Sequence, residues 1–161
     1  IQIPFYLKDI GVQSNSMIGI AIASSTFFSA IAAISYSKIK DKFSFAQVFA
    51  LGYFLMAIAY VLIAMGNSYT MVMLGMLFGG LGMGIMIPNA NIWVMQLAPA
   101  EIRGKEIGRL TTFWFMGQFL SPLLLLPLLD FLTQSQLYYF IAGILLALSS
   151  FYLVFHFFNN K

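Results

Sequence analysis

MIGIAIASSTFFSAIAAISYSKIKDKFSFAQVFALGYFLMAIAYVLIAM, residues 17–65, consists of two uncharged apolar runs separated by a short charged loop. The loop places three lysines and one aspartate in the five positions 38–42. Each flanking run is about 20 residues long, which is the length of α-helix that crosses a hydrocarbon core of about 30 Å. This stretch therefore predicts two membrane-spanning helices joined by a charged turn.

The composition of the whole chain agrees with lipid as its main solvent. Of 161 residues, 61% are hydrophobic and 8% charged, with a mean hydropathy of +0.90, whereas a soluble domain has about 25% charged residues. The net charge of +3 is too small for a basic nucleic-acid surface, so no nucleic acid is expected. The chain has no cysteine, which excludes disulfides and thiolate metal sites. We expect no cofactor.

The same pattern of apolar run and polar break continues along the chain. A single run near the start would resemble a secretion signal, but a series of runs does not, and barrel strands would alternate in segments of about 10 residues. The sequence therefore predicts an all-α polytopic membrane protein, with residues 1–16 as the end of a truncated helix and an outer loop of a longer chain. The expected spans are 17–36, 45–65, 69–96, 110–129 and 137–158.

The basic residues are distributed unevenly between the two sides that five alternating spans define. Seven of the eight lysines and arginines fall on one side, in residues 37–44, 97–109 and the tail that ends at Lys161. Short loops rich in Lys and Arg stay cytoplasmic. We therefore expect this side and the C-terminus to face the cytoplasm, with the protein in the plasma (inner) membrane.

The charged loop is the first of several motifs that resemble one family. Its order, Ser37, KIK, Asp41, Lys42, Phe43 and Ser44, is similar to the short cytoplasmic loop of the major facilitator superfamily, with serine at both glycine positions. Four further segments are similar to the family's outer loop, Gly-rich helix, next cytoplasmic loop and following helix. These are PFYLKDIGVQSNSMIGIAIA, FGGLGMGIMIPNANIW, APAEIRGKEIG and MGQFLSP. The resemblance covers essentially the whole chain.

This resemblance implies a fold and an activity. Degenerate motifs are typical of the family's second half, so the chain would be the end of the seventh helix plus helices eight to twelve, a partial major-facilitator-type six-helix half bundle. The implied activity is secondary active transport of a small organic solute by alternating access of two halves around a site near the bilayer midplane. The implied partners are the lipid bilayer, the missing N-terminal half of the same chain and the substrate. The implied protein is not an enzyme.

In the family, the charged loop braces against the opposite half, so the resemblance implies a gate. Asp41 would pair with a base or with the positive end of a helix dipole. Lys42 and Arg103 are basic residues of the two loops that carry the resemblance. The alternative is a solvated loop whose lysines only determine the membrane orientation.

Polar residues within the apolar spans are the candidate substrate path, because an unpaired polar group in hydrocarbon is costly. Spacings of three or four residues place them on common helical faces. The candidates are Ser25, Ser29, Asn89, Trp93, Trp114 and Gln118. The alternative is that such side chains bond to their own or a neighbouring helix. Runs 45–65 and 137–158 have fewer polar positions and are expected to face lipid.

The Gly-rich run is a candidate for helix packing, because small residues at spacings of three and four let helices approach closely. Two faces are expected, one with Gly75, Gly79 and Gly82 and one with Gly80 and Gly84. Pro88 follows these glycines and favours a kink.

The uncharged aromatic faces favour export of drugs or metabolites, and uptake of a sugar or similar neutral solute is the alternative within the same class. No acid or histidine lies in the middle of a span, so the coupling ion is not predicted. Two other classes of protein are alternatives: a non-transporting membrane sensor or scaffold, and an intramembrane enzyme. The enzyme is disfavoured because paired aspartates, a Ser–His pair or a His–Glu zinc site would be needed within the membrane.

Overall fold

The computed structural model describes residues 3–66 and 68–159, which form an all-helical bundle without strands in these ranges. Two helices are short, α1 (Ile3–Asp9) and α3 (Tyr36–Lys40). The long helices are α2 (Asn15–Ile34), α4 (Phe45–Met65), α5 (Tyr69–Leu97), α6 (Arg103–Leu125) and α7 (Gln134–Asn159). Single turns of 3₁₀ helix at Ala100–Ile102 and Leu126–Asp130 flank α6. Five segments are long and apolar enough to cross a membrane, so the predicted all-α membrane class is confirmed.

Serine side chains determine where three of the long helices begin. Ser14, Ser44 and Ser68 each accept a hydrogen bond from the backbone N–H three residues later, which satisfies a donor that the helix itself leaves free. Ser44 also forms a capping box, because its N–H donates to Gln47 Oε1 at 2.9 Å. The first span therefore begins at Asn15, before the apolar run itself.

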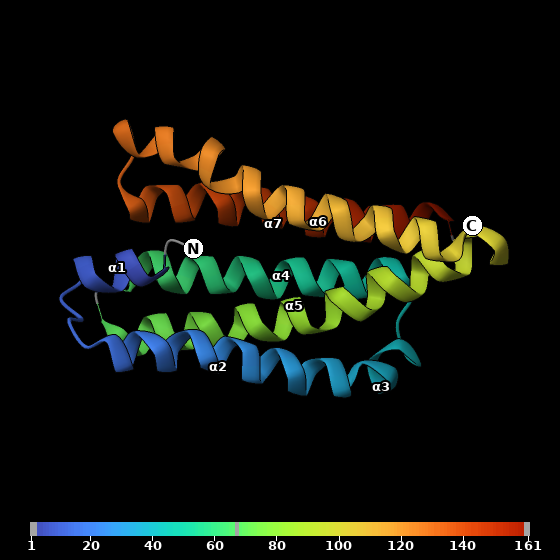
Figure 1. The fold of residues 1–161 in the computed structure, drawn as a ribbon, viewed down its shortest axis with the longest axis horizontal. Helices are drawn as coiled ribbons and strands as arrows, with labels where there is room; N and C mark the ends of the chain where they lie inside the picture. The colour runs from blue at the N-terminus through green and yellow to red at the C-terminus, as the bar shows by residue number, and fades with distance from the viewer. Residues whose placement is uncertain (1–2, 67, 160–161) are drawn as a thin grey trace.

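The central helix is α4, which lies between α5 and α7, while α2 packs on the other side of α5 (Figure 1). This position differs from the expectation that run 45–65 faces lipid. The buried residues of α4 include Ala46, Ala50, Ala57 and Ala59. Small apolar side chains let helices pack closely without polar contacts. The low polar content of run 45–65 therefore did not mean that this helix faces lipid.

The glycines of α5 meet two different neighbours. A Cβ on Gly80 or Gly84 would collide with backbone atoms of Ser25 or Ser29 on α2. A Cβ on Gly82 would come within 2.8 Å of the Gly52 carbonyl oxygen on α4. Because only the missing side chain permits these approaches, the spacing of α5 from both α2 and α4 depends on glycine.

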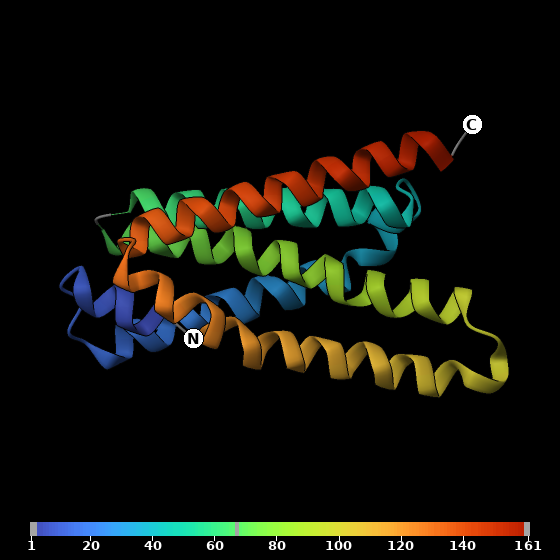
Figure 2. The same cartoon turned by 90° about the horizontal axis from the view of Figure 1, so that it is seen from above.

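Two ends of the bundle are distinguished in Figures 1 and 2. The loop around α3, the turn between α5 and α6 and the C-terminal end of α7 lie together at one end, and α1 lies at the other. We call the first the basic end, defined by residues 37–44, 98–109 and 156–159. Lys161, which was counted among the basic residues of this side, lies outside the described residues.

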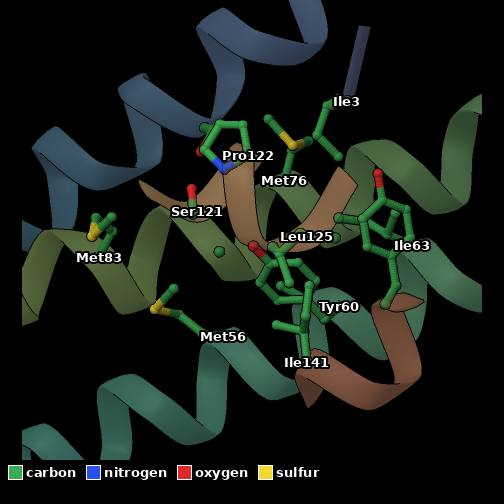
Figure 3. A pocket seen from close by; sticks show the side chains of 15 residues that line it. Ile3, Met56, Tyr60, Ile63, Met76, Met83, Ser121, Pro122, Leu125 and Ile141 are labelled. Atoms are coloured by element: carbon green, nitrogen blue, oxygen red, sulfur yellow. The ribbon is translucent and has the colours of Figure 1, made fainter. Parts of the chain in front are cut away.

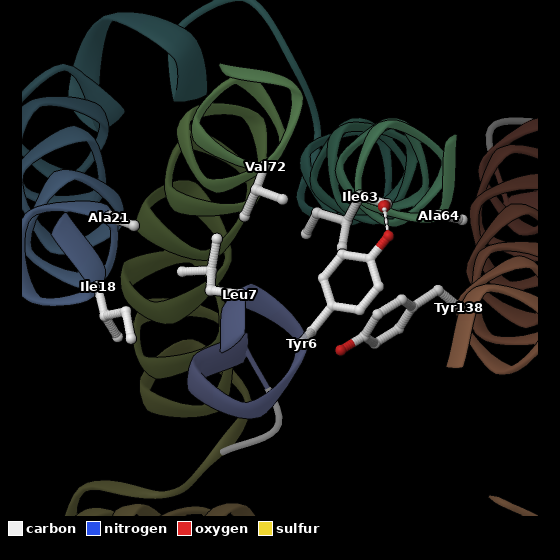
Figure 4. Close-up of a cluster of buried hydrophobic side chains, with 8 residues drawn as sticks. All are labelled: Tyr6, Leu7, Ile18, Ala21, Ile63, Ala64, Val72 and Tyr138. Carbon is white, nitrogen blue, oxygen red and sulfur yellow. Dashed lines mark hydrogen bonds between the residues drawn. The ribbon is translucent and has the colours of Figure 1, made fainter. Parts of the chain in front are cut away.

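The short helix α1 is fixed to the opposite end of the bundle by a buried cluster (Figure 4). The Tyr6 hydroxyl donates to the carbonyl oxygens of Ile63 at 2.8 Å and Gly66 at 3.0 Å, which satisfies acceptors at the end of α4. The Tyr6 ring meets Tyr138 edge-on, with 5.2 Å between ring centroids. This cluster joins α1 to α2, α4, α5 and α7.

Candidate functional site

A cavity of about 280 Å³ lies between α2, α4, α5, α6 and α7 (Figure 3). Its walls are mainly aliphatic and thioether side chains, with Gly75 and Gly79 where α5 contributes no side chain. Ile3 of α1 also reaches it. The apolar lining includes Met56, Met76, Met83, Ile63, Leu125 and Ile141.

The polar groups of the cavity are four hydroxyls, from Ser25, Tyr60, Ser121 and Tyr138. Ser121 donates to a carbonyl of its own helix, that of Gln118, at 3.3 Å. The Tyr138 hydroxyl is buried and has no hydrogen-bond partner among the described residues, although a buried polar group normally has one. Tyr138 therefore borders the cavity with a buried hydroxyl that the described residues leave unsatisfied.

The electrostatics of the cavity are simple, because none of the described residues that line it is charged. No group of three His, Asp or Glu side chains gathers as a metal site in ranges 3–66 and 68–159. Thioethers and aromatic rings are polarisable and accommodate varied apolar shapes. The arrangement suits an uncharged or weakly polar aromatic molecule that accepts one or two hydrogen bonds.

Of the six residues predicted to line the substrate path, Ser25 is the one that borders this cavity. Ser29, one turn further along α2, is half-buried with its backbone against Gly84. Trp114 is half-buried and Gln118 is exposed on α6. The cavity thus collects side chains from more helices than the predicted faces do.

Asn89 and Trp93 lie nearer the basic end and outside the cavity. Asn89 is fully buried and bonds to Tyr36 and to the Phe45 carbonyl oxygen. The Trp93 ring stacks on the Phe45 ring, with centroids 5.6 Å apart and planes 3° from parallel. These contacts connect α3, the start of α4 and α5.

The predicted gate residues are all exposed at the basic end. Asp41 is the C-cap of α3, and Lys42 follows it. Arg103 Nε donates to the Ala98 carbonyl oxygen at 3.2 Å. Within the described part of the chain the ion pair is that of Arg109 with Glu106, at 2.7 Å, so the gate residues do not pair with one another there.

Sequence reasoning did not single out the tyrosines and methionines of the cavity. Tyr60 and Tyr138 were counted as apolar positions within runs 45–65 and 137–158. A signal was present, because a tyrosine hydroxyl within an apolar run needs a hydrogen-bond partner as a serine does. The methionines had no comparable signal, since Met fills gaps in any core.

Comparisons with known proteins point in one direction. The sequence model of the Major Facilitator Superfamily matches residues 1–161. The Quinolone resistance protein NorA of Staphylococcus aureus (strain N315) is 23% identical over 120 residues, which are 74% of this chain and 31% of that protein. The Multidrug resistance protein MdtG of Proteus mirabilis is 28% identical over 148 residues, 89% of this chain and 36% of that protein. The chain spans about a third of the length of these curated relatives.

Proposed function

The chain belongs to the Major Facilitator Superfamily, and from that premise we propose that it is the C-terminal half of a secondary transporter that exports small organic compounds. The observation that carries the proposal is the uncharged cavity lined by methionine and tyrosine. Membrane insertion is supported by the five apolar helices. The resistance names of two relatives support drugs as the class of exported compound.

Export of apolar compounds fits the cavity better than uptake of a sugar. A sugar carries many hydroxyls, each of which needs a partner when it leaves water. The cavity offers four hydroxyls, and Asn89 and Gln118, whose amides would suit a hydroxyl-rich ligand, are not among its lining residues. The apolar walls instead match a ligand that leaves water readily.

The transport cycle that we propose is alternating access between this half and a second helical half. The large exposed surface of α6 supports this division, because Phe113, Phe115 and Phe119 stand away from the described bundle. Part of this surface would contact lipid and part the second half. We propose that the basic end faces the cytoplasm, since loops rich in Lys and Arg are retained there, and that Asp41, Lys42 and Arg103 belong to the gate on that side.

The test is to fill the cavity in the full-length protein. In Gly79→Phe the added Cβ meets Ala59 Cβ at an ordinary 3.5 Å, so the backbone tolerates a side chain at this position, which borders the cavity. We expect export of an uncharged, fluorescent lipophilic compound from cells to fall about tenfold, the effect of losing about 1.4 kcal/mol of binding. The measurement is the initial rate of efflux, at expression levels matched by immunoblot.

Gly143→Phe is the matched control, because Gly143 has no atom within 4 Å of an added Cβ. It introduces the same ring into a membrane-spanning helix but away from the cavity, and export should stay within about twofold of wild type. Equal export by wild type, Gly79→Phe and cells without the protein would count against export as the function. An equal loss of export in Gly79→Phe and Gly143→Phe would count against the cavity as the substrate-binding site.

A further inference from the structure

Asn89 is the most deeply buried polar side chain of the described bundle, with 0% of its surface exposed. It lies in α5, one residue after Pro88, close to the basic end. Its Oδ1 accepts a hydrogen bond from the Tyr36 hydroxyl at 3.0 Å. Its Nδ2 donates to the Phe45 carbonyl oxygen at 3.0 Å. One amide therefore joins three segments that are separate in the sequence.

The contacts at position 89 need a polar side chain that can serve both neighbours, as the amide of Asn89 does. The Tyr36 hydroxyl is a donor, and the Phe45 carbonyl is an acceptor, so the side chain between them must accept and donate at once. Aspartate would accept only, and leucine would do neither.

Aromatic contacts hold the same segments from a second side. The Phe45 ring lies parallel to Trp93, one turn beyond Asn89 in α5. Lys40 Nζ lies 4.1 Å from the Phe45 ring centroid and donates to the Phe43 carbonyl oxygen at 3.3 Å. The charged loop is therefore attached at its beginning by Tyr36 and at its end by Phe45.

We propose that Asn89 is a positioning residue that clasps the charged loop, residues 37–44, to α5. The clasp is the set Tyr36, Asn89 and Phe45, and it makes α3, the first turn of α4 and the end of α5 beyond Pro88 move as one unit. In the transporter proposed above, this unit is the movable part of the gate. The role of this unit in the gate rests on the proposed function, whereas the clasp itself does not.

Limited trypsin digestion of the purified full-length protein in detergent tests the clasp directly. Lys38, Lys40 and Lys42 lie within the clasped loop, and Arg103, Lys105 and Arg109 provide an internal control at the same end. We expect Asn89→Leu to raise the initial cleavage rate at residues 38–42 about tenfold, because a buried pair of hydrogen bonds is lost. Cleavage at residues 103–109 should stay within about twofold of wild type.

Two further variants make the result decisive. Tyr36→Phe removes a single oxygen and keeps the ring, so it tests the clasp even if Asn89→Leu does not fold. We expect it to raise the initial cleavage rate at residues 38–42 about threefold. Asn91→Leu is the matched control, since Asn91 is half-buried in the same helix and makes no clasp contact. Unchanged cleavage of the clasped loop in Tyr36→Phe, or an equal increase in both loops, would overturn the proposal.

Transport kinetics separate a positioning role from substrate contact. Asn89 lies outside the cavity, so Asn89→Leu should lower the maximal export rate while the substrate concentration at half-maximal rate stays within about twofold. A changed half-maximal concentration with an unchanged maximal rate would instead assign Asn89 to the substrate site. Absence of export in wild type would contradict the proposed function alone, because proteolysis reports on the clasp without it.

Discussion

Helices α5 and α6 are neighbours in sequence, are both long and apolar enough to cross a membrane and each contain an internal proline, yet they are stabilised differently. In the most apolar stretch of α5 39% of the residues are buried, whereas none is buried in that of α6 within the described bundle. Glycine content does not explain the difference, because Gly104, Gly108 and Gly117 of α6 have no neighbouring atom near an added Cβ. The difference lies in what faces each glycine.

This contrast teaches how to interpret small and polar residues in a membrane helix. On α5 a glycine permits contact with another helix, and Asn89 bonds to two other segments. On α6 the hydroxyls of Thr111 and Thr112 return to carbonyl oxygens of their own helix, both at 2.9 Å. These two hydroxyls of α6 are thus satisfied locally and need no partner helix.

The largest expected effect distinguishes the glycines of the two helices. In Gly80→Leu the new side chain meets the backbone of Ser25, which cannot move aside as a flexible side chain does. We expect α2 and α5 to separate and the free energy of unfolding to fall by about 3 kcal/mol. Gly117→Leu on α6 enters open space and should leave the free energy of unfolding unchanged or raise it by up to about 0.8 kcal/mol, because leucine is the better helix former. The measurement is thermal unfolding in detergent; equal losses in both variants would remove the distinction between the helices.

The second effect compares a hydrogen bond between helices with one inside a helix. Tyr6→Phe removes the donor to the carbonyl oxygens of Ile63 and Gly66 and leaves both without that partner. The expected loss is about 1–3 kcal/mol of unfolding free energy. Thr111→Val removes a bond to the carbonyl oxygen of Ile107 in the same helix, and a change below about 0.5 kcal/mol is expected. A larger effect of Thr111→Val than of Tyr6→Phe in denaturant titrations would contradict this account.

Much of the fold could be predicted because its causes are local. Apolar runs of membrane-crossing length predicted the all-α membrane class. The start of a helix depends on capping residues within a few positions, and Ser44 and Gln47 form such a cap at the start of α4. Pro88 and the glycines of α5 are also visible in the sequence, because their effect on the backbone comes from their own covalent structure.

The rest depends on partners that are distant in sequence. Asn89 was placed by its spacing on a substrate face, but its hydrogen-bond partners lie 53 and 44 residues earlier. The central position of α4 follows from packing of its alanines against two other helices, which hydropathy does not encode. The position of Tyr138 beside the cavity, with a hydroxyl that has no partner among the described residues, depends on how five helices pack together.

The smallest effect tests the same contrast with two adjacent serines of α7. The Ser149 hydroxyl donates to the Ala50 carbonyl oxygen of α4 at 2.8 Å and is buried. The Ser150 hydroxyl donates to the Leu146 carbonyl oxygen of its own helix at 2.9 Å and is exposed. We expect Ser149→Ala to lower the free energy of unfolding by about 0.6 kcal/mol, the average for a hydrogen bond between membrane helices.

Ser150→Ala provides the control for this pair, because it is the same substitution at the next position and alters helix propensity equally. Ser150→Ala should leave the free energy of unfolding unchanged or raise it slightly, since alanine is the better helix former. The two single variants and the double variant, measured by denaturant titration, should be additive because the serines share no partner. An effect of Ser150→Ala equal to that of Ser149→Ala would mean that the identity of the accepting helix does not matter. The distinction between α5 and α6 would then rest on glycine contacts alone.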